Sequence, residues 1–516
     1  MGAGRELSST RAHADERRVH GSRGRSAQVA ALAVTAVLGL LTLPRPLYGD
    51  QALFAVGARE LAGGAVLYRD FWDIKQPGVY WFYEAAGRLF GFTEVGLHLG
   101  ELLWQLALAG LLTAAVRPLL RRPVLAAIVP VATVGVYYAT ARLNSLTQVE
   151  SLISLPLFGC LAAGLRATTS SGRRAAVWLL LSGCAGAISL VFKLIFAPVV
   201  LALLVTVVLA HRHGSRRHAT LFLIAGLAIP AVATCADLAA HGELGEALRV
   251  WLVLPPRLSL LPGERALVNL TDGTARFIVS CAPMLLLGLV AVVRRLRRGF
   301  DPMVVGLLAW AVLGALLVLA QLWWPYLWMA VVVPVGVLGV LGLDDLLAWR
   351  ASSLGRGRRP TAARILAGLC VAALLGPIGL FARQVAPTAR HGFGITSQQR
   401  AALRTELDPV NAADLAALGA IPRSASMYVL GDPTLLYLAD KPQAEPINGW
   451  SPDLFLPEQC RDFASALARR PPTYLFVARH SLAVWHTRCP ASRDVREPFE
   501  LVTRTANGAW WRTSSS

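Results

Sequence analysis

Long apolar stretches alternate with short polar loops along most of this chain. Each stretch is about 17–25 residues long, which is enough for an α-helix to cross the hydrocarbon core of a bilayer. The segment from Ala175 to Ala210 is too long for one span, and Lys193 near its centre divides it into a hairpin of two. The pattern predicts an α-helical polytopic membrane protein of about eleven transmembrane helices. They are expected at residues 27–47, 95–116, 123–140, 149–165, 175–192, 194–210, 219–239, 275–293, 303–322, 326–342 and 362–381.

The pattern changes after about Arg383. Two strand-like runs, S-M-Y-V-L and T-Y-L-F-V, lie on either side of a helical run near residues 458–469, and a Gly-Asp-Pro turn follows the first run. These signals predict a small α/β domain. We therefore expect a disordered basic tail at 1–26, a membrane domain at 27–383 with a first external loop at 48–94, and the α/β domain at 384–516.

Composition agrees with a membrane protein, and the charge distribution predicts its orientation. Hydrophobic residues make up 55% of the 516 residues, and the formal net charge is +19. The arginines cluster in alternate loops, as the positive-inside rule requires of cytoplasmic loops. With an odd number of spans, this pattern places the N-terminus in the cytoplasm and the α/β domain outside the cell membrane. Because topology accounts for the positive charge, we expect no nucleic-acid partner.

Seven cysteines are present, and their spacing does not match a metal site. Five lie in predicted spans, where cysteine packs as a small core residue. Cys460 and Cys489 lie in the predicted external domain, where a disulfide is permitted. The sequence leaves open whether these two residues pair.

Candidate chemistry gathers in the first external loop. Asp50 follows the first span and opens an amphipathic helix, where an aspartate is also a preferred N-cap. A Gly-Gly turn and a short aromatic strand then lead to the segment D-I-K-Q-P, which contains Asp73 and Lys75. Only three of the 50 basic residues are lysines, and Lys75 and Lys193 both fall at the predicted outer surface. A compact ammonium binds phosphate as a point charge, so these two lysines are candidate phosphate ligands; the alternative is that they reach toward lipid headgroups.

Two later external segments add polar residues. Glu150 opens a span after the loop that contains Arg142, and an acidic residue there would also stabilise the helix through its dipole. The run W-W-P-Y-L-W from Trp323 to Trp328 is typical of an aromatic belt at the membrane interface.

The order of features from Gly49 to Gly91 resembles the first external loop of membrane glycosyltransferases with the GT-C fold. The similar enzymes are the protein O-mannosyltransferases and aminoarabinose transferases, of glycosyltransferase families 39 and 83. The resemblance implies that Asp50 is the general base, and Asp73 and Glu150 are further candidate catalytic residues. Lys75, with Lys193 and Arg142, is the candidate ligand of the donor phosphate.

The chain departs from the family pattern at two positions. Gln76 replaces the first proline of the usual K-P-P motif, and Pro325 stands where many relatives have a histidine before a retained tyrosine, Tyr326. Any role of that histidine in the family is therefore not carried over to this chain.

The resemblance implies an inverting glycosyltransferase that moves a sugar from a polyprenyl-phosphate donor to an extracytoplasmic hydroxyl. The acceptor would be a polysaccharide, a lipid or a protein. No cofactor is required, although the sequence leaves open whether a divalent metal ion binds between Asp50 and Glu150. The alternatives are a transporter or flippase of a lipid-linked sugar and an inactive scaffold. Transporters place charges deep within their spans, whereas the charges here gather at one surface, which favours an enzyme.

Overall fold

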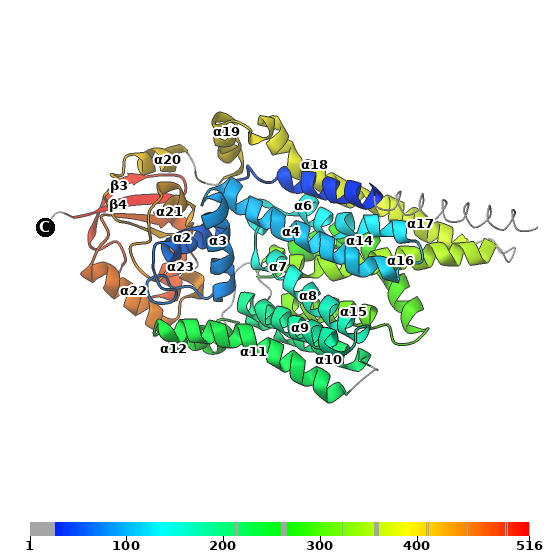
Figure 1. Cartoon of the computed structure of the whole chain (residues 1–516). Coiled ribbons are helices and arrows are strands. Elements are labelled where there is room, and N and C mark those ends of the chain that lie inside the picture. The colour runs from blue at the N-terminus through cyan, green and yellow to red at the C-terminus, as the bar shows by residue number, and fades with distance from the viewer. Residues whose placement is uncertain are drawn as a thin grey trace, which may run out of the picture.

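The computed structural model describes residues 26–211, 215–259, 266–321, 324–354, 361–408, 410, 412–450, 452–490, 492 and 494–514. Nearly all of the predicted N-terminal tail and Trp323 lie outside these residues. A bundle of long helices forms one end of the molecule and a small α/β unit forms the other (Figure 1). Helices α2 (Asp50–Ala62) and α3 (Pro77–Phe90) of the first loop lie between them.

The bundle is that of a multi-pass membrane protein. Two of the predicted spans coincide with apolar helices that are shorter than the others, Ser26–Leu40 and Leu194–Ala210. All eleven predicted stretches therefore overlap apolar helices, while the number that cross the bilayer stays a prediction. In the part of the chain described here, nine helices are long and apolar enough to cross a membrane: Glu94–Leu119, Pro123–Thr140, Val149–Thr168, Gly172–Phe192, Arg216–Ala240, Leu267–Leu296, Pro302–Gln321, Pro325–Ser352 and Ala367–Arg390.

Small residues let the bundle helices approach closely. The long helices are α4 (Glu94–Val116), α8 (Ser154–Thr168), α9 (Gly172–Phe192), α10 (Ala197–Ala210), α11 (Arg216–Ala240), α14 (Ala266–Leu296), α15 (Pro302–Gln321), α16 (Met329–Leu354), α17 (Thr361–Ala373) and α18 (Leu375–Arg390). Helix α9 packs between α8 and α11, and α14 packs along α16. A Cβ on Gly183 would lie 2.2 Å from the Leu223 carbonyl oxygen, so glycine is needed where α9 meets α11.

Short helical turns join these helices. They are η1 (Arg117–Leu119), η2 (Pro123–Ala127), α5 (Ile128–Pro130), η3 (Val131–Gly135), α6 (Val136–Thr140), η4 (Leu143–Ser145), α7 (Val149–Leu152), η5 (Leu194–Phe196), α12 (Leu244–Leu248), η6 (Arg249–Val253), α13 (Leu254–Ser259) and η7 (Pro325–Trp328). Lys193 lies between α9 and α10, which confirms the predicted hairpin.

Ion pairs and hydrogen bonds hold α16 against α14 and the loops beside it. Asp344 and Asp345 are fully buried. Asp345 accepts hydrogen bonds from Arg295 Nε at 2.9 Å and Arg298 at 3.1 Å, while Asp344 accepts the backbone N–H of Arg121 at 3.0 Å. These arginines belong to loops that the charge pattern predicts to be cytoplasmic, so part of the positive charge compensates buried carboxylates.

The α/β unit is built on a four-stranded sheet in the order β1-β2-β4-β3. Strand β1 (Met427–Leu430) pairs in parallel with β2 (Tyr474–Ala478), and β4 (Gly508–Thr513) pairs antiparallel with both β2 and β3 (Phe499–Arg504). Its helices are η8 (Gly392–Gly394), α19 (Ser397–Leu407), α20 (Ala412–Gly419), α21 (Thr434–Ala439), η9 (Pro452–Leu454), α22 (Pro457–Arg469) and α23 (Arg479–Arg488).

This unit confirms and extends the sequence prediction. The two strand-like runs form β1 and β2, and the predicted helix is α22. Strands β3 and β4 were not predicted. A disulfide joins Cys460 to Cys489, which answers the question that the sequence left open. The unit has a core of its own around Tyr428, Phe463 and Trp485.

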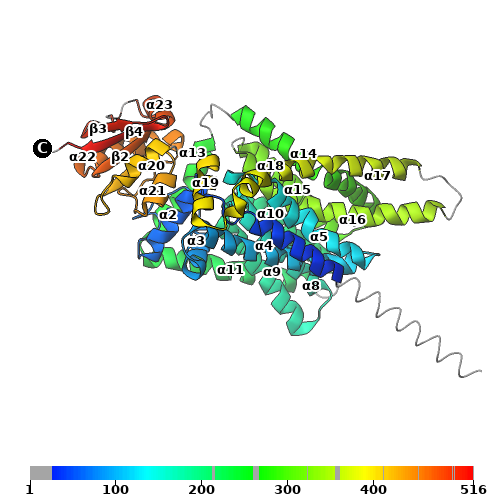
Figure 2. The ribbon, with the colours of Figure 1, turned by 90° about the horizontal axis from the view of Figure 1, so that it is seen from above.

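The first external loop is tied to the α/β unit. Trp72 donates its backbone N–H to the Pro446 carbonyl at 2.8 Å, and Glu60 accepts the backbone N–H of Gln443 at 2.7 Å. The prediction of a short aromatic strand after the Gly-Gly turn was wrong, because this segment forms only isolated bridges, one of them from Trp72 to Ile447. Figure 2 shows the same arrangement from above, with α2 and α3 beside the α/β unit.

Candidate functional site

Asp50 is the first residue of α2, and its carboxylate is held by two donors. The N-cap position is taken by Gly49, so the interpretation of Asp50 as the N-cap was wrong. Tyr326 of η7 donates its hydroxyl to Asp50 Oδ2 at 2.9 Å, and the Trp450 indole donates to Oδ1 at 2.7 Å. The Asp50 side chain is 11% exposed, so a small reactant can still reach it.

Lys75 lies beside Asp50 with its ammonium available to a ligand. Its Nζ is 3.8 Å from Asp50 Oδ2, and its side chain is 23% exposed. Burial lowers the pKa of Lys75, but the carboxylates of Asp50, Asp73 and Glu150 together outweigh it, and the net direction is upward. The ammonium therefore stays charged. Among the described residues it donates no hydrogen bond, and its nearest aromatic neighbour is Phe54, 5.7 Å from Nζ to the ring centroid.

Glu150 and Lys193 form a second pair. Lys193 donates to Glu150 Oε1 and to the side-chain oxygen of Gln321, the latter at 3.4 Å. The Glu150 side chain is only 3% exposed. The structure thus pairs a predicted catalytic acid with a predicted phosphate ligand. The ammonium of Lys193 therefore contacts the Glu150 carboxylate, so this lysine does not reach only toward lipid headgroups.

Asp73 and Arg142 have structural partners. Asp73 is buried, accepts the Tyr80 hydroxyl at 2.6 Å and lies 3.3 Å from the side-chain nitrogen of Asn448. Arg142 forms a bidentate ion pair with Asp272 of α14, at 2.6 and 2.9 Å. The catalytic role of Asp73 and the phosphate role of Arg142 stay predictions.

The sequence reasoning did not select Tyr326 and Trp450 as site residues. Tyr326 carried one signal, because it is the retained tyrosine of the family's histidine-tyrosine pair. Trp450 carried no local signal, since it lies 400 residues from Asp50 in the chain and reaches it only through the fold. The aromatic-belt interpretation of the Trp323–Trp328 run therefore does not describe Tyr326, whose hydroxyl faces Asp50.

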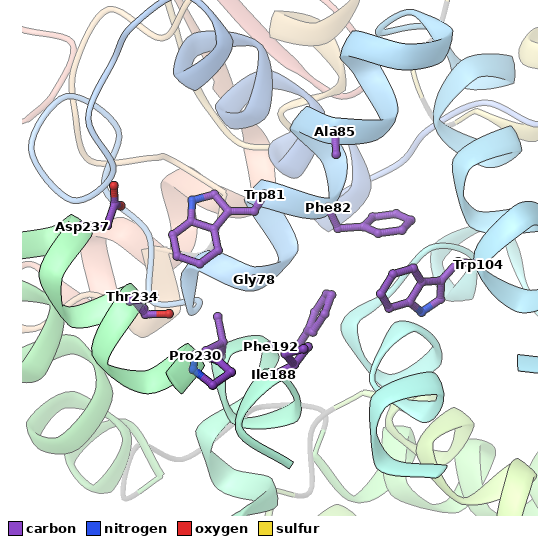
Figure 3. A pocket seen from close by; sticks show the side chains of 12 residues that line it. Gly78, Trp81, Phe82, Ala85, Trp104, Ile188, Phe192, Pro230, Thr234 and Asp237 are labelled. Atoms are coloured by element: carbon purple, nitrogen blue, oxygen red, sulfur yellow. The ribbon is translucent and has the colours of Figure 1, made fainter. Parts of the chain in front are cut away.

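An apolar groove of about 610 Å³ opens between α3, α4, α9 and α11. Figure 3 shows Trp81, Phe192 and Pro230 around the same space. Gly78 permits the contact of α3 with α9, because a Cβ there would lie 2.8 Å from the Val191 carbonyl oxygen. Gly78 closely follows Lys75 in the chain, and Phe192 directly precedes Lys193, so each lysine is a near chain neighbour of a residue that lines the groove. The lining residues are Gly78, Trp81, Phe82, Ala85, Trp104, Ile188, Val191, Phe192, Pro230, Ala233, Thr234 and Asp237.

The acidic residues of the site do not fit a divalent metal ion well. Within the described ranges, no group of three or more His, Cys, Asp or Glu residues is placed to hold a metal. Asp50 already accepts two hydrogen bonds, and Glu150 is paired with the ammonium of Lys193. Two carboxylates without a third His, Cys, Asp or Glu side chain beside them do not supply the several ligand positions that Mg²⁺ or Ca²⁺ requires.

Comparisons with known proteins agree with this fold. Residues 75–236 match the model of the dolichyl-phosphate-mannose-protein mannosyltransferase family. The structure is similar to that of ArnT from Cupriavidus metallidurans in the apo state, with a TM-score of 0.59, 17% identity and coverage of 94% of this chain and 97% of ArnT. For ArnT bound to undecaprenyl phosphate the TM-score is 0.60, the identity 16%, and the coverage 95% and 98%. No curated protein sequence matches the chain.

The family match covers the first loop from Lys75 onward and the spans that follow it, while the similarity of fold extends over nearly the whole chain. The chain therefore has the fold of ArnT, a GT-C fold, and its segment 75–236 is similar to the protein-mannosyltransferase family.

Proposed function

We propose that this enzyme moves a sugar from a polyprenyl-phosphate donor to a hydroxyl group at the extracytoplasmic membrane surface, with inversion at the anomeric carbon. One observation carries the proposal. The charged ammonium of Lys75 makes no hydrogen bond to any described residue, yet it lies 3.8 Å from the Asp50 carboxylate and near an apolar groove. A partly buried cation with unused donors is costly unless a ligand or water satisfies them.

The groove and Lys75 suit the two halves of such a donor. A polyprenyl chain is apolar and reaches a membrane enzyme from the lipid phase, and the groove lies between helices of the bundle. The phosphate at its head carries the negative charge that an ammonium attracts as a point charge. The matched family is named for a dolichyl-phosphate donor, and one similar structure contains undecaprenyl phosphate. Both names support this donor class here.

Asp50 is the proposed general base. As the acceptor oxygen attacks the anomeric carbon, its O–H proton passes to the Asp50 carboxylate. The bond from the anomeric carbon to the phosphate oxygen breaks with its electron pair, and polyprenyl phosphate leaves. Attack from the face opposite the leaving group inverts the anomeric configuration. Lys75 stabilises the charge on the departing phosphate, so no acid is needed to protonate it.

The proposed orientation follows the positive-inside pattern, with the N-terminus in the cytoplasm and the α/β unit outside. The acceptor would then be an exported protein, a cell-envelope polysaccharide or a lipid. No step is assigned to a metal ion.

A transfer assay tests the proposal. Purified enzyme would be placed in vesicles that contain polyprenyl-phosphate sugars of several kinds, and release of polyprenyl phosphate and formation of sugar–acceptor product would be measured. We expect turnover by the native enzyme and a loss of about 10²–10³ for Asp50→Asn. Asp70→Asn is the matched control, because Asp70 is an exposed carboxylate of the same loop, paired with Arg69. Equal turnover of Asp50→Asn and the native enzyme would refute the proposed base.

A further inference from the structure

We propose that Trp450 of the α/β unit is a positioning residue for the Asp50 carboxylate, so that this unit completes the reaction site. The inference rests on the proposed function, in which Asp50 is the base. It is carried by the hydrogen bond from Trp450 Nε1 to Asp50 Oδ1 at 2.7 Å, which joins residues from opposite ends of the chain.

The two donors on Asp50 fix the plane of its carboxylate. Tyr326 holds Oδ2 and Trp450 holds Oδ1, each from a different part of the protein. A carboxylate held at only one oxygen can rotate about its last side-chain bond, whereas one held at both cannot. Each oxygen keeps a second lone pair. Each oxygen can thus still accept a proton from a hydroxyl, in a direction that the two donors fix.

Trp450 is itself held by the first external loop. Its backbone N–H donates to the Asn448 side-chain oxygen at 3.2 Å, and the Asn448 side-chain nitrogen donates to the Trp72 carbonyl at 3.1 Å. The same nitrogen lies 3.3 Å from Asp73 Oδ1. Asp73, which the sequence suggested as catalytic, thus contacts the segment that carries Trp450.

Gly49 makes room for the indole. A Cβ on Gly49 would lie 2.8 Å from Trp450 Cζ2, and the backbone φ of Gly49 is 58°, in the region that favours glycine. The ring of Tyr48 packs edge-on against the indole with centroids 6.1 Å apart. The chain before Asp50 is therefore shaped to receive a side chain from the α/β unit.

The indole hydrogen bond has a consequence for pH dependence. A donor to an ionised carboxylate favours the ionised form, so its loss makes the carboxylate easier to protonate. Fewer molecules then carry the free base at mildly acidic pH. The other titratable groups around the site remain in a Trp450 variant, and they are Tyr48, Asp73, Lys75, Glu150, Tyr326 and Asp432. A shift of the acid limb of the pH profile would therefore be due to loss of the indole hydrogen bond and not to loss of another titratable group.

The test compares Trp450→Phe with the native enzyme in the vesicle assay from pH 5 to 8. Phenylalanine keeps an aromatic ring but removes the N–H. We expect kcat to fall about 10-fold, the size of one charge-assisted hydrogen bond. We expect the KM for the donor to stay unchanged, and the acid limb of the kcat profile to move to higher pH. Tyr326→Phe, which removes the other donor, should move the acid limb in the same direction.

Trp511→Phe is the matched control. Trp511 lies in β4 of the same unit, and within the described residues its Nε1 has no hydrogen-bond partner. We expect native kcat and a native pH profile for this variant. Trp450→His restores a ring N–H and should recover part of the loss. If Trp450→Phe folds poorly, the kcat and pH profile of Trp450→His still test whether a ring N–H at this position supports the reaction.

Three outcomes would overturn the inference. A Trp450→Phe enzyme with native kcat and a native pH profile would show that the indole does not position the base. A slower Trp450→Phe enzyme with an unmoved acid limb and no recovery in Trp450→His would indicate a purely structural role. A native enzyme without transfer activity, or an active Asp50→Asn variant, would instead refute the proposed function on which the inference rests.

Discussion

Replacing Lys75 with methionine keeps the length of the side chain and removes its charge. At 3.8 Å, the interaction of the Lys75 ammonium with the Asp50 carboxylate amounts to about 4 kcal/mol at an effective dielectric constant of about 20. The same ammonium is proposed to stabilise the leaving phosphate, and loss of one such group typically costs about 10²–10³ in kcat. We therefore expect Lys75→Met to lose ~10²–10³ in kcat, with a smaller rise in the KM for the donor.

Lys75→Arg should recover only part of this loss. A planar guanidinium does not reproduce the point charge of an ammonium, although the net charge is kept. The surrounding carboxylates raise the pKa of Lys75 against the opposing effect of burial. The contribution of the charged ammonium to stability is therefore fully present below the usual pKa of lysine, and it is lost only as the pH rises through the raised pKa. Lys75 should therefore add no limb to the pH profile between pH 6 and 9.

The assay is transfer in vesicles, with kcat and the KM for the donor measured separately. Arg69→Gln is the matched control, because Arg69 is an exposed cation of the same loop. Turnover of Lys75→Met within about twofold of that of Arg69→Gln would refute the reasoning, since a group that stabilises a leaving phosphate cannot be removed at so small a cost.

Three further predictions concern stability. Arg295→Gln leaves a buried carboxylate of α16 with one partner fewer and should lower the melting temperature of the detergent-solubilised protein well below that of the exposed control Arg297→Gln. Burial raises the pKa of Asp432 to about 6, so ionising it costs stability above about pH 6, and this cost disappears as the pH falls toward 4. Asp432→Asn should therefore be more stable than the native protein by roughly 3 kcal/mol at pH 7.5 and by only about 1 kcal/mol at pH 4.5, which thermal melts at the two pH values would show. Replacing Cys460 and Cys489 by serine removes a closed loop with a sequence separation of 29 and should cost roughly 3–4 kcal/mol, which limited proteolysis of the α/β unit would reveal.

Much of the membrane domain could be predicted from the sequence, because hydropathy is a local property that any long apolar segment must show. The hairpin at Lys193 was found for this reason, since one charge interrupts an apolar run that is too long for a single span. Strands β3 and β4 escaped prediction. Strand β3 is exposed over most of its length and β4 buries only one residue, so neither carries the apolar signal of β1 and β2.

The candidate site was only partly predictable. Asp50 and Lys75 were selected together, and the structure brings them together. The sequence could not show that Lys193 pairs with Glu150 or that Arg142 pairs with Asp272, because both contacts join distant segments. Trp450 shows the limit most clearly. Its link to Asp50 depends on how the α/β unit packs on the first loop, and no local pattern records that packing.

The measurement that tests the central claim most directly compares membrane lipids of cells that carry the native chain with those of cells that carry Asp50→Asn. Polyprenyl-phosphate sugars would be extracted and identified by mass spectrometry, with the amount of each protein checked. We predict that a polyprenyl-phosphate sugar accumulates only in the Asp50→Asn cells, because the donor is made but not consumed. An unchanged lipid profile, with the variant present at the native level, would contradict sugar transfer at Asp50.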